Sequence, residues 1–544
     1  MSLLGQPSDP FDVLVIGSGA TGGLAAKRLT ERGMKVALLE AGRETVAADF
    51  AHHDGHQVGG FTPSPMQIAV ARPIQVKCYA CRAERHEWFV NDLENPYLQM
   101  EPYHWIRMRV LGGRLLAWAG HCYRMSDLDF KACRHDGYGE DWPISYKDLV
   151  SYYDEIECYL GVTGVPERLP QLPDGLYCPP AAINLTEAIL RKSTVKTFDR
   201  VVTPARLAAM TCKTTPANTE GAWQRLHPLR GGSQFSSPWT ALVDAANTGR
   251  LTLITDAVVA HVLMKDGRAV GVEYVDRNGC NSREVYGKCI ILCASTLEST
   301  RILLNSAICN SSGTLGRYLM DHICGVAASG IVEVDKKRLL SPSHERHRVY
   351  IPRFRNVATQ MTNSFIRGYG FQGNTEPITD SKYVDALPTT NARSTYATVT
   401  LASFGECLAR KENFVEIDNE RVDEWGIPIL KVRATWSTNE IRLSRDAAEQ
   451  AVEILEAAGV RDIRMEGKIS VPGLCAHEIG TARMGIDHKT SVVNQFCQAH
   501  DVRNIFITDG ACWVSSGCQN PTLTMMAITL RACDYIVHEA FKTF

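Results

Sequence analysis

A glycine-rich turn near the N-terminus contains the residue types that bind a pyrophosphate. Gly17, Gly19 and Gly22 form the pattern G-x-G-x-x-G, directly after the apolar run 12–16 and before a helical stretch. In such a turn the first glycine permits a tight bend, the second lets the backbone approach the phosphates, and the third lets the helix pack on the strand. The N-terminus of the helix adds unpaired N–H groups and the positive end of its dipole. The turn therefore predicts a dinucleotide site.

A carboxylate follows at the place where a ribose would lie. Glu40 ends a second apolar run, 35–40, and stands 40 − 22 = 18 residues after Gly22. It can accept hydrogen bonds from ribose hydroxyls, and it would repel a 2′-phosphate. The two runs and the helix between them predict a βαβ unit. The fingerprint alone does not distinguish FAD from NAD.

Two further residues near the C-terminus have side chains that can exchange a proton or a hydrogen bond with a hydroxyl group. His477 precedes a glycine-rich turn, and Asn520 precedes a helix that we expect to begin near Thr522. A neutral imidazole, with an ordinary pKa near about 6.5, can take a hydroxyl proton at neutral pH. A carboxamide can hydrogen-bond the same hydroxyl without adding charge. The residue types alone also fit a core histidine and an asparagine that caps the helix.

The C-terminal sequence resembles a known flavoprotein motif. Residues 477–485 (HEIGTARMG) and 491–536 are similar to the C-terminal motif of the glucose–methanol–choline (GMC) oxidoreductase family, closest to its sugar-oxidising branch. The resemblance covers most of the chain and is thinnest over about 165–225 and 330–410. Further matching segments lie at 109–113, 123–130, 141–157, 293–306 and 316–322.

The resemblance implies FAD as the cofactor, and it assigns residues to each part of that molecule. The implied contacts, besides the glycine turn and Glu40, are Asp509 and Gly510 for the ribityl and phosphate part, Val258 or Val259 for the adenine, Gly112 and Gly113 for the pyrophosphate and flavin side, and Asn520, Pro521 and Thr522 for the isoalloxazine ring.

The same resemblance implies that His477 is the catalytic base and that Asn520 is its partner, 520 − 477 = 43 residues later. One position departs from the family pattern. Some sugar-oxidising relatives have a histidine before the tryptophan that follows Gly-Gly, and this histidine bonds covalently to the flavin. Here Ala117 precedes Trp118, and alanine has no nucleophile. We therefore expect noncovalent FAD, with His121 as a less favoured alternative attachment point.

We expect an α/β chain, α+β overall, with a Rossmann-like FAD-binding domain and a substrate domain that contains an antiparallel sheet. Residues 251–293 predict strands joined by hairpins, and residues 413–435 predict two more. An amphipathic helix is expected over 437–458, whereas 340–395 is polar and predicts loops. The expected division is discontinuous: 1–160, 226–330 and 465–544 for FAD, and 161–225 and 331–464 for the substrate.

The composition excludes several classes of protein. Among 544 residues, 45% are hydrophobic and 22% charged, and the net charge is −2, as in ordinary globular enzymes that do not bind nucleic acid or anionic membranes. We see no signal peptide and no run of about 18 apolar residues, so we expect a cytoplasmic protein without a membrane span, or a periplasmic one if a partner subunit exports it. Cys78 and Cys81 form a lone C-x-x-C pair, which favours neither zinc nor a disulfide, and we expect no metal.

The favoured function is FAD-dependent oxidation of a secondary alcohol of a sugar or glycoside to a ketone, with C3 preferred on resemblance. We favour a dehydrogenase that passes electrons to a quinone, dye or cytochrome over an oxidase that uses O2. A polyol or natural-product alcohol as substrate, and a non-redox flavoprotein, stay as alternatives. A small subunit or a homo-oligomer is also open. Arg109 and Arg124, beside the Gly-Gly motif, are expected to form structural ion pairs, and the aromatic residues between 79 and 105 to pack in the core or line a sugar pocket.

Overall fold

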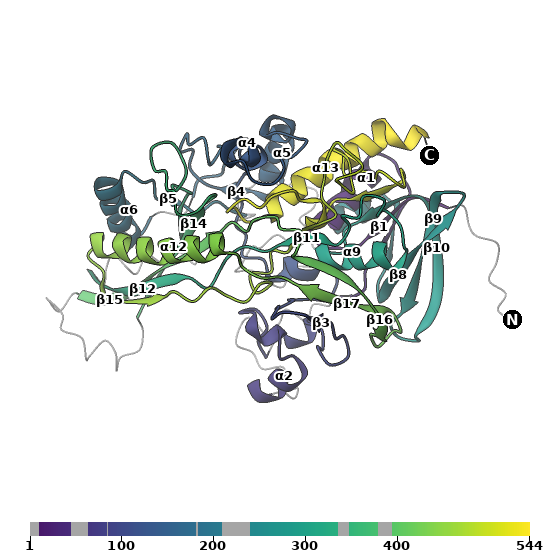
Figure 1. The fold of residues 1–544 in the computed structure, drawn as a ribbon, viewed down its shortest axis with the longest axis horizontal. Coiled ribbons are helices and arrows are strands. Elements are labelled where there is room, and N and C mark those ends of the chain that lie inside the picture. Colours follow the sequence, from purple (N-terminus) through teal and green to yellow (C-terminus); the bar gives the residue numbers. More distant parts are fainter. Residues whose placement is uncertain are drawn as a thin grey trace.

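The computed structural model describes residues 10–44, 64–83, 85–180, 183–208, 240–335, 348–378 and 394–543. Its elements form an elongated molecule with different sheets toward its two ends (Figure 1). The sheet that contains the N-terminal strand lies at one end, and the sheet covered by the long helix α12 (Thr438–Ala457) lies at the other. The candidate site lies where elements of both ends meet.

The first of these sheets has a parallel part built around the N-terminal strand β1 (Phe11–Ile16). The parallel order is β7-β2-β1-β10-β20, with bounds Leu251–Ile254, Val36–Leu39, Phe11–Ile16, Asn281–Leu292 and Ile505–Ile507. Strand β1 is buried on both faces, as the apolar run predicts. The βαβ unit expected from the glycine motif is present.

Alternate residues of β1 point into two different cores. Val13 and Val15 pack with the helices α1 (Ala20–Glu31), α8 (Ala241–Asn247) and α13 (Thr522–His538). Leu14 and Ile16 pack on the other face with residues of β8 (Ala257–Lys265) and β9 (Arg268–Asp276). This two-sided burial fixes the end of β1, where the glycine turn begins.

Strand β10 belongs to two kinds of sheet at once. Its second half, from Gly287, pairs in parallel with β1, and its first half pairs antiparallel with β9. Strand β9 in turn pairs with β8, so the predicted hairpins over 251–293 are present. The turn at Asp266 and Gly267 has positive φ angles of 50° and 75° at these two residues, which suits the Asp-Gly pair.

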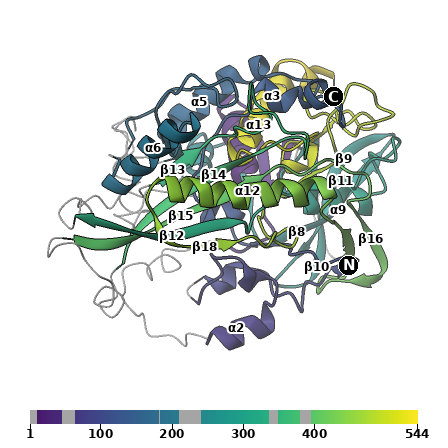
Figure 2. The same cartoon turned by 60° about the vertical axis from the view of Figure 1, so that its left-hand side comes forward.

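The second sheet is antiparallel and six-stranded, as expected for the substrate side. Its order is β18-β12-β15-β14-β13-β5, with bounds Arg461–Glu466, Ala327–Asp335, Ser394–Gly405, Tyr369–Pro377, Arg348–Ile351 and Thr203–Pro204. Helix α12 lies across one face of it (Figure 2). Ser437 and Glu440 cap this helix reciprocally, and its buried side, which includes Leu443 and Ile454, packs on the sheet.

A third sheet has five strands, and two of them, β16 and β17, lie near β8 in the view of Figure 1. Its order is β19-β11-β16-β17-β3, with bounds Ile479–Thr481, Arg317–Met320, Phe414–Val422, Pro428–Arg433 and Leu98–Gln99. Strands β16 and β17 come from 331–464, the segment assigned above to the substrate domain, yet they pair with strands from outside it. The domain boundaries stay a prediction.

The expectation of loops over 340–395 is wrong in part. Strands β13 and β14 lie there, and β15 begins at Ser394. The sequence of β14, YGFQGNTEP, has two glycines and little β-branched character. Pairing on both sides, with β13 and β15, stabilises it despite this composition, which shows that tertiary pairing outweighs local strand propensity.

Shorter elements complete the described part. They are α2 (Pro65–Ala71), α3 (Asp127–Phe130), α4 (Ala132–Asp136), α5 (Val150–Leu160), α6 (Leu185–Phe198), α9 (Thr296–Asn305), β4 (Val162–Thr163), β6 (Leu207–Ala208) and the 3-10 turns 75–77, 86–88, 113–117, 146–148, 510–512 and 540–543. None of the described helices combines the length and apolar character needed to cross a membrane.

Candidate active site

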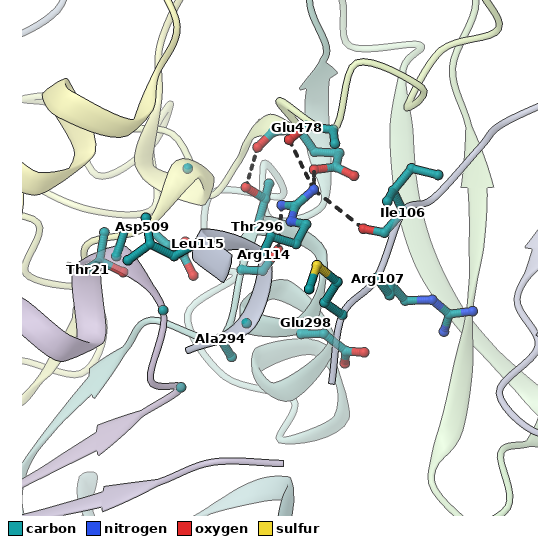
Figure 3. Close-up of a pocket in the computed structure, with 18 of the residues that line it drawn as sticks. Thr21, Ile106, Arg107, Arg114, Leu115, Ala294, Thr296, Glu298, Glu478 and Asp509 are labelled. Carbon is teal, nitrogen blue, oxygen red and sulfur yellow. Dashed lines mark hydrogen bonds and ion pairs between the residues drawn. The ribbon is translucent and has the colours of Figure 1, made fainter. Parts of the chain in front are cut away.

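A cavity of about 370 Å³ lies where these elements meet, within the roughly 300–1,000 Å³ typical of small-molecule sites. Figure 3 shows the residues around it. All of the predicted site residues except Gly22 and Gly112 line it: Gly17, Gly19, Glu40, Gly113, Val258, His477, Asp509, Gly510, Asn520 and Thr522. The fold thus brings together residues that are more than 500 positions apart in the 544-residue chain.

The glycine turn is as tight as its sequence predicts. Gly17 has φ +98°, and a Cβ there would lie 2.4 Å from the carbonyl oxygen of Cys293. A Cβ at Gly22 would lie 1.8 Å from the Gly17 oxygen, so Gly22 is needed for packing rather than for the cavity wall. Gly19 is the N-cap of α1, and no side chain caps this helix end. The first-turn N–H groups therefore face the cavity without a capping side chain, as phosphate binding requires.

Glu40 is held by the glycine turn itself. Its Oε2 accepts hydrogen bonds from the Ser18 N–H at 3.0 Å and the Ser18 hydroxyl at 2.5 Å, and its Oε1 accepts one from the Gly42 N–H at 2.7 Å. Burial raises the pKa of this carboxyl, and these hydrogen bonds oppose the rise. The Ser18 hydroxyl also accepts the N–H of Gly112 at 2.8 Å. Gly112 therefore acts behind the cavity wall, through Ser18.

Asp509 is held at the cavity wall by hydrogen bonds from nearby donors. Its side chain accepts the Ser299 hydroxyl at 2.5 Å and the Ala511 N–H at 3.0 Å. Burial raises its pKa to about 6. A Cβ at Gly510 would lie 2.5 Å from the Thr296 hydroxyl oxygen, so only glycine fits beside Asp509.

His477 lies in the loop before β19, and its backbone is fixed by a buried carboxylate. The N–H of His477 donates to Asp321 at 3.0 Å, and the same carboxylate accepts the N–H groups of Gly473 and Cys475 at 2.8 and 3.2 Å. Burial, reinforced by the positive field of Arg114, lowers the pKa of the imidazole well below 6.5. His477 is therefore neutral at physiological pH, the state that a general base needs.

Asn520 reaches the same cavity from the start of α13. Its side-chain oxygen accepts a hydrogen bond from the Gln372 amide at 2.7 Å. No side chain caps α13, whose N-cap is Pro521, so the alternative role of Asn520 as a helix cap is wrong. Gln372 belongs to β14, in the segment where the sequence predicted loops, and it also lines the cavity.

An ion pair inside the cavity was missed by the sequence reasoning. Arg114 and Glu478 contact each other at 2.5 Å (Figure 3), and the guanidinium also donates to the Ala476 carbonyl at 3.1 Å and the Ser295 hydroxyl at 3.1 Å. Arg114 follows Gly113, and Glu478 follows His477, so adjacency to predicted site residues was the available signal. The pair joins the Gly-Gly turn to the loop that carries His477.

Other singled-out residues fall into two groups. Ala117, Trp118 and His121 line the cavity, and Arg109 does so while paired with Glu298 at 3.2 Å. The fully buried Arg124, bonded to Glu157 at 2.6 Å and to Asp154, lies outside it. Both arginines make the structural ion pairs expected of them. Of the Tyr and Trp residues between 79 and 105, Tyr79 and Trp105 line the cavity, whereas Trp88, Tyr97 and Tyr103 pack in the core.

The cysteine pair is not arranged as a metal site in the described residues. Cys78 and Cys81 are both free thiols, and burial raises the pKa of Cys81 to about 11. Across the described ranges, no group of three or more His, Cys, Asp or Glu side chains is placed to hold a metal ion. Cys78 lines the cavity.

The cavity fits FAD on its own evidence. At one end, the turn leaves no room for a side chain at Gly17, and from Gly19 it presents the N–H groups of α1. Glu40 and Asp509 line the same cavity and supply acceptors for hydroxyls, and Thr522 stands at the N-terminus of α13. A dinucleotide needs donors for its phosphates and acceptors for its hydroxyls, and the cavity provides both.

Comparisons with known proteins identify the family of the chain. Two family models described as GMC oxidoreductase match residues 11–324 and 409–529. The 2-methyl-1,2-propanediol dehydrogenase of Mycolicibacterium austroafricanum is 28% identical over 97% of this chain and 95% of its own. The fructose dehydrogenase large subunit of Gluconobacter japonicus is 25% identical over 97% and 98%.

A solved structure has the same fold. Pyridoxine 4-oxidase from Mesorbium loti superposes with a TM-score of 0.63 at 18% identity, over 97% of this chain and 99% of that one. With the family matches to more than half of the chain and the cavity described above, the conclusion is direct: the chain belongs to the GMC oxidoreductase family and is an FAD-dependent oxidoreductase acting on alcohol groups.

Proposed function

We propose that the protein oxidises a secondary alcohol of a sugar or glycoside to a ketone, with His477 as the base and Asn520 as its hydrogen-bonding partner. The observation that carries the proposal is that both side chains line one cavity with the residues expected to bind FAD. The base is also neutral, because burial lowers the pKa of its imidazole. The choice of the carbon that is oxidised, C3 by preference, rests on the resemblance to the sugar-oxidising branch of the family.

The chain's residues account for the proton half of the reaction. The substrate hydroxyl donates its proton to the His477 imidazole while it accepts a hydrogen bond from Asn520. A bound FAD would supply the hydride acceptor for the carbon that carries this hydroxyl. One proton and one hydride leave the alcohol together, so the carbon is oxidised by two electrons to a carbonyl.

The N-terminus of α13 supports this chemistry electrostatically. Thr522 begins the helix at the cavity wall, and no side chain neutralises the helix end. A helix N-terminus favours negative charge by about 0.3–1 kcal/mol in exposed settings and by more when partly buried. Asn520 stands just before this helix, so the positive end of the dipole lies beside Asn520 at the cavity wall.

A second candidate substrate class is a small diol or polyol. The relative with 28% identity is named for a branched diol, whereas the fructose dehydrogenase subunit is 25% identical. The cavity offers hydrogen-bonding and stacking groups for a polyhydroxylated ring beside the catalytic pair: Gln372, Phe404, Trp118 and His121. These groups favour a sugar as the substrate.

The experiment is anaerobic reduction of the bound flavin by a panel of pyranoses, glycosides, polyols and branched diols, with products identified by NMR. Bleaching by a sugar or glycoside with a keto-sugar product supports the proposal. If only diols bleach the flavin, the substrate belongs to the second candidate class. If no alcohol bleaches it, both candidate substrate classes are refuted.

The electron acceptor and the flavin linkage have their own tests. We propose a dehydrogenase, so reduction of a quinone or dye should be much faster than formation of hydrogen peroxide in air. Ala117 lines the cavity without a nucleophile, so acid precipitation should release the flavin into the supernatant. Flavin that stays with the pellet contradicts noncovalent binding.

A further inference from the structure

A second histidine, His322, lies directly behind the catalytic one. It follows β11 in the sequence MDH and is fully buried. Its Nδ1 lies 3.2 Å from the Nδ1 of His477, and the two rings are nearly perpendicular, at 88°. His322 does not line the cavity, and the steps proposed above do not use it.

The other nitrogen of His322 identifies which of its atoms carries the proton. Its Nε2 lies 2.5 Å from the carbonyl oxygen of Gly517. A carbonyl can only accept, so Nε2 of His322 is the donor. Burial lowers the pKa of His322 to about 4, so the ring is neutral and holds one proton. Its Nδ1 therefore carries a lone pair and no proton.

The lone pair on His322 determines the state of His477. An acceptor at 3.2 Å requires the Nδ1 of His477 to be the donor. The sulfur of Cys475, 3.3 Å from the same Nδ1, is a weak acceptor and is compatible with a proton there. A neutral imidazole has one proton, so the Nε2 of His477 is left with its lone pair.

We propose that His322 is a positioning residue. Hydrogen bonds that run from the Gly517 carbonyl through His322 to His477 hold the catalytic histidine in the Nδ1–H tautomer. They thereby present its Nε2 as the proton acceptor. This inference rests on the proposed role of His477 as the base. Asp321 and His322 then both hold His477: Asp321 fixes the backbone of its loop, and His322 fixes its ring.

The partner asparagine is oriented in a complementary way. Gln372 donates its amide to the Asn520 oxygen at 2.7 Å, which leaves the Asn520 NH2 group as the donor for a substrate hydroxyl. The cavity then offers that hydroxyl one acceptor, on His477, and one donor, on Asn520. A hydroxyl both donates and accepts, so it satisfies both groups at once.

The test compares two substitutions of His322 in the FAD-loaded enzyme. His322→Leu removes the acceptor, whereas His322→Asn keeps an oxygen close to the position of Nδ1. We expect His322→Leu to slow flavin reduction at saturating substrate by about 10²-fold, the scale of general-base catalysis, with little change in substrate affinity. His322→Asn should stay within about tenfold of the wild type. His500→Leu, at a partly buried histidine outside the cavity, is the matched control and should leave the rate unchanged.

Nitrogen NMR of histidine-labelled enzyme gives a readout that packing alone does not move. The Nε2 signal of His477, identified by its absence in His477→Ala, should have the shift of an unprotonated nitrogen in the wild type and of a protonated or mixed one in His322→Leu. Wild-type rates in His322→Leu overturn the proposal. Equal losses in the Leu and Asn variants with an unchanged Nε2 signal also overturn it.

These outcomes separate the inference from the function on which it rests. If His477→Ala reduces its flavin as fast as the wild type, the role of His477 is wrong whatever His322 does. If His477→Ala is inactive and His322→Leu is fully active, the base is correct and the tautomer assignment alone is wrong.

Discussion

The two ends of the cavity are built by different means. The nucleotide end consists mainly of backbone and short local motifs: a strand end, a glycine turn and the start of α1, with Glu40 held by its neighbour Ser18. The catalytic end consists of side chains that meet across the chain. His477 contacts His322 over 155 positions, and Asn520 contacts Gln372 over 148.

The difference shows which kind of site tolerates change. A backbone cradle depends on the absence of side chains, so a single added methyl group obstructs it. A side-chain constellation depends on protonation and orientation, so its geometry can survive a substitution that abolishes its chemistry. The predictions below separate these two kinds of damage.

The largest effect on FAD binding is expected from Gly22→Ala. The new Cβ would lie 1.8 Å from the Gly17 oxygen, so α1 must move away from the turn. We expect the purified protein to lose its flavin and to be destabilised by about 1–3 kcal/mol. Absorbance of bound flavin and thermal unfolding measure the two effects. Gly467→Ala is the control, because its nearest neighbours lie at 3.7 Å or more; equal flavin content in the two variants would contradict the packing argument.

At the catalytic end, Asn520→Ala should retain FAD and lose rate. It removes the donor to the substrate hydroxyl and leaves the Gln372 amide without its acceptor. We expect flavin reduction to slow by about 10²-fold, the scale for loss of one well-placed donor. Anaerobic stopped-flow measures the rate. A variant that loses flavin instead would place Asn520 among the structural residues.

A smaller effect at the nucleotide end is expected from Glu40→Gln. The carboxylate accepts from three donors in the Ser18 and Gly42 region, and an amide keeps only one oxygen for them. Loss of a charged acceptor costs about 1.5–3 kcal/mol, so FAD affinity should fall about tenfold to a hundredfold. Titration of the flavin-free protein measures it. The reduction rate of the FAD-loaded variant should be close to that of the wild type, and a large rate loss would show that the two ends are not separable.

The smallest effect is a shift of the pH profile. The base acts only when it is deprotonated, and burial lowers the pKa of His477 well below 6.5. Activity should therefore persist as the pH falls through 6.5 and decline only in more acidic solution. The pH dependence of kcat/KM for the free enzyme measures this. If kcat/KM instead declines around pH 6.5 or above, the ordinary pKa of histidine, the cavity does not lower the pKa of the base.

The nucleotide end was predictable because its signals are local. The strand, the turn at Gly17 and the distance to Glu40 stand in one short segment, and the structure has the βαβ unit they predict. His477 and Asn520 were singled out through a family resemblance, and the cavity contains both. His322 and Gln372 could not be assigned roles, because their contacts cross between sheets and depend on pairing of strands such as β14 that local composition does not indicate.

Arg114 and Glu478 illustrate the same limit. Each follows a residue already chosen, yet a buried ion pair is a property of two segments 364 positions apart. A sequence shows the two charges but not that they meet inside a cavity. Helix and strand periodicity predicted the α12 helix and the hairpins well, since those depend on neighbours along the chain.

The most direct measurement is anaerobic reduction of the bound flavin by a substrate sugar in the wild type and in His477→Ala, side by side, with equal FAD content. The account predicts rapid bleaching in the wild type and a rate about 10²–10⁴ lower in the variant, with an unchanged flavin spectrum before mixing. Equal rates in the two proteins would contradict it, because the proton of the alcohol would then have another acceptor.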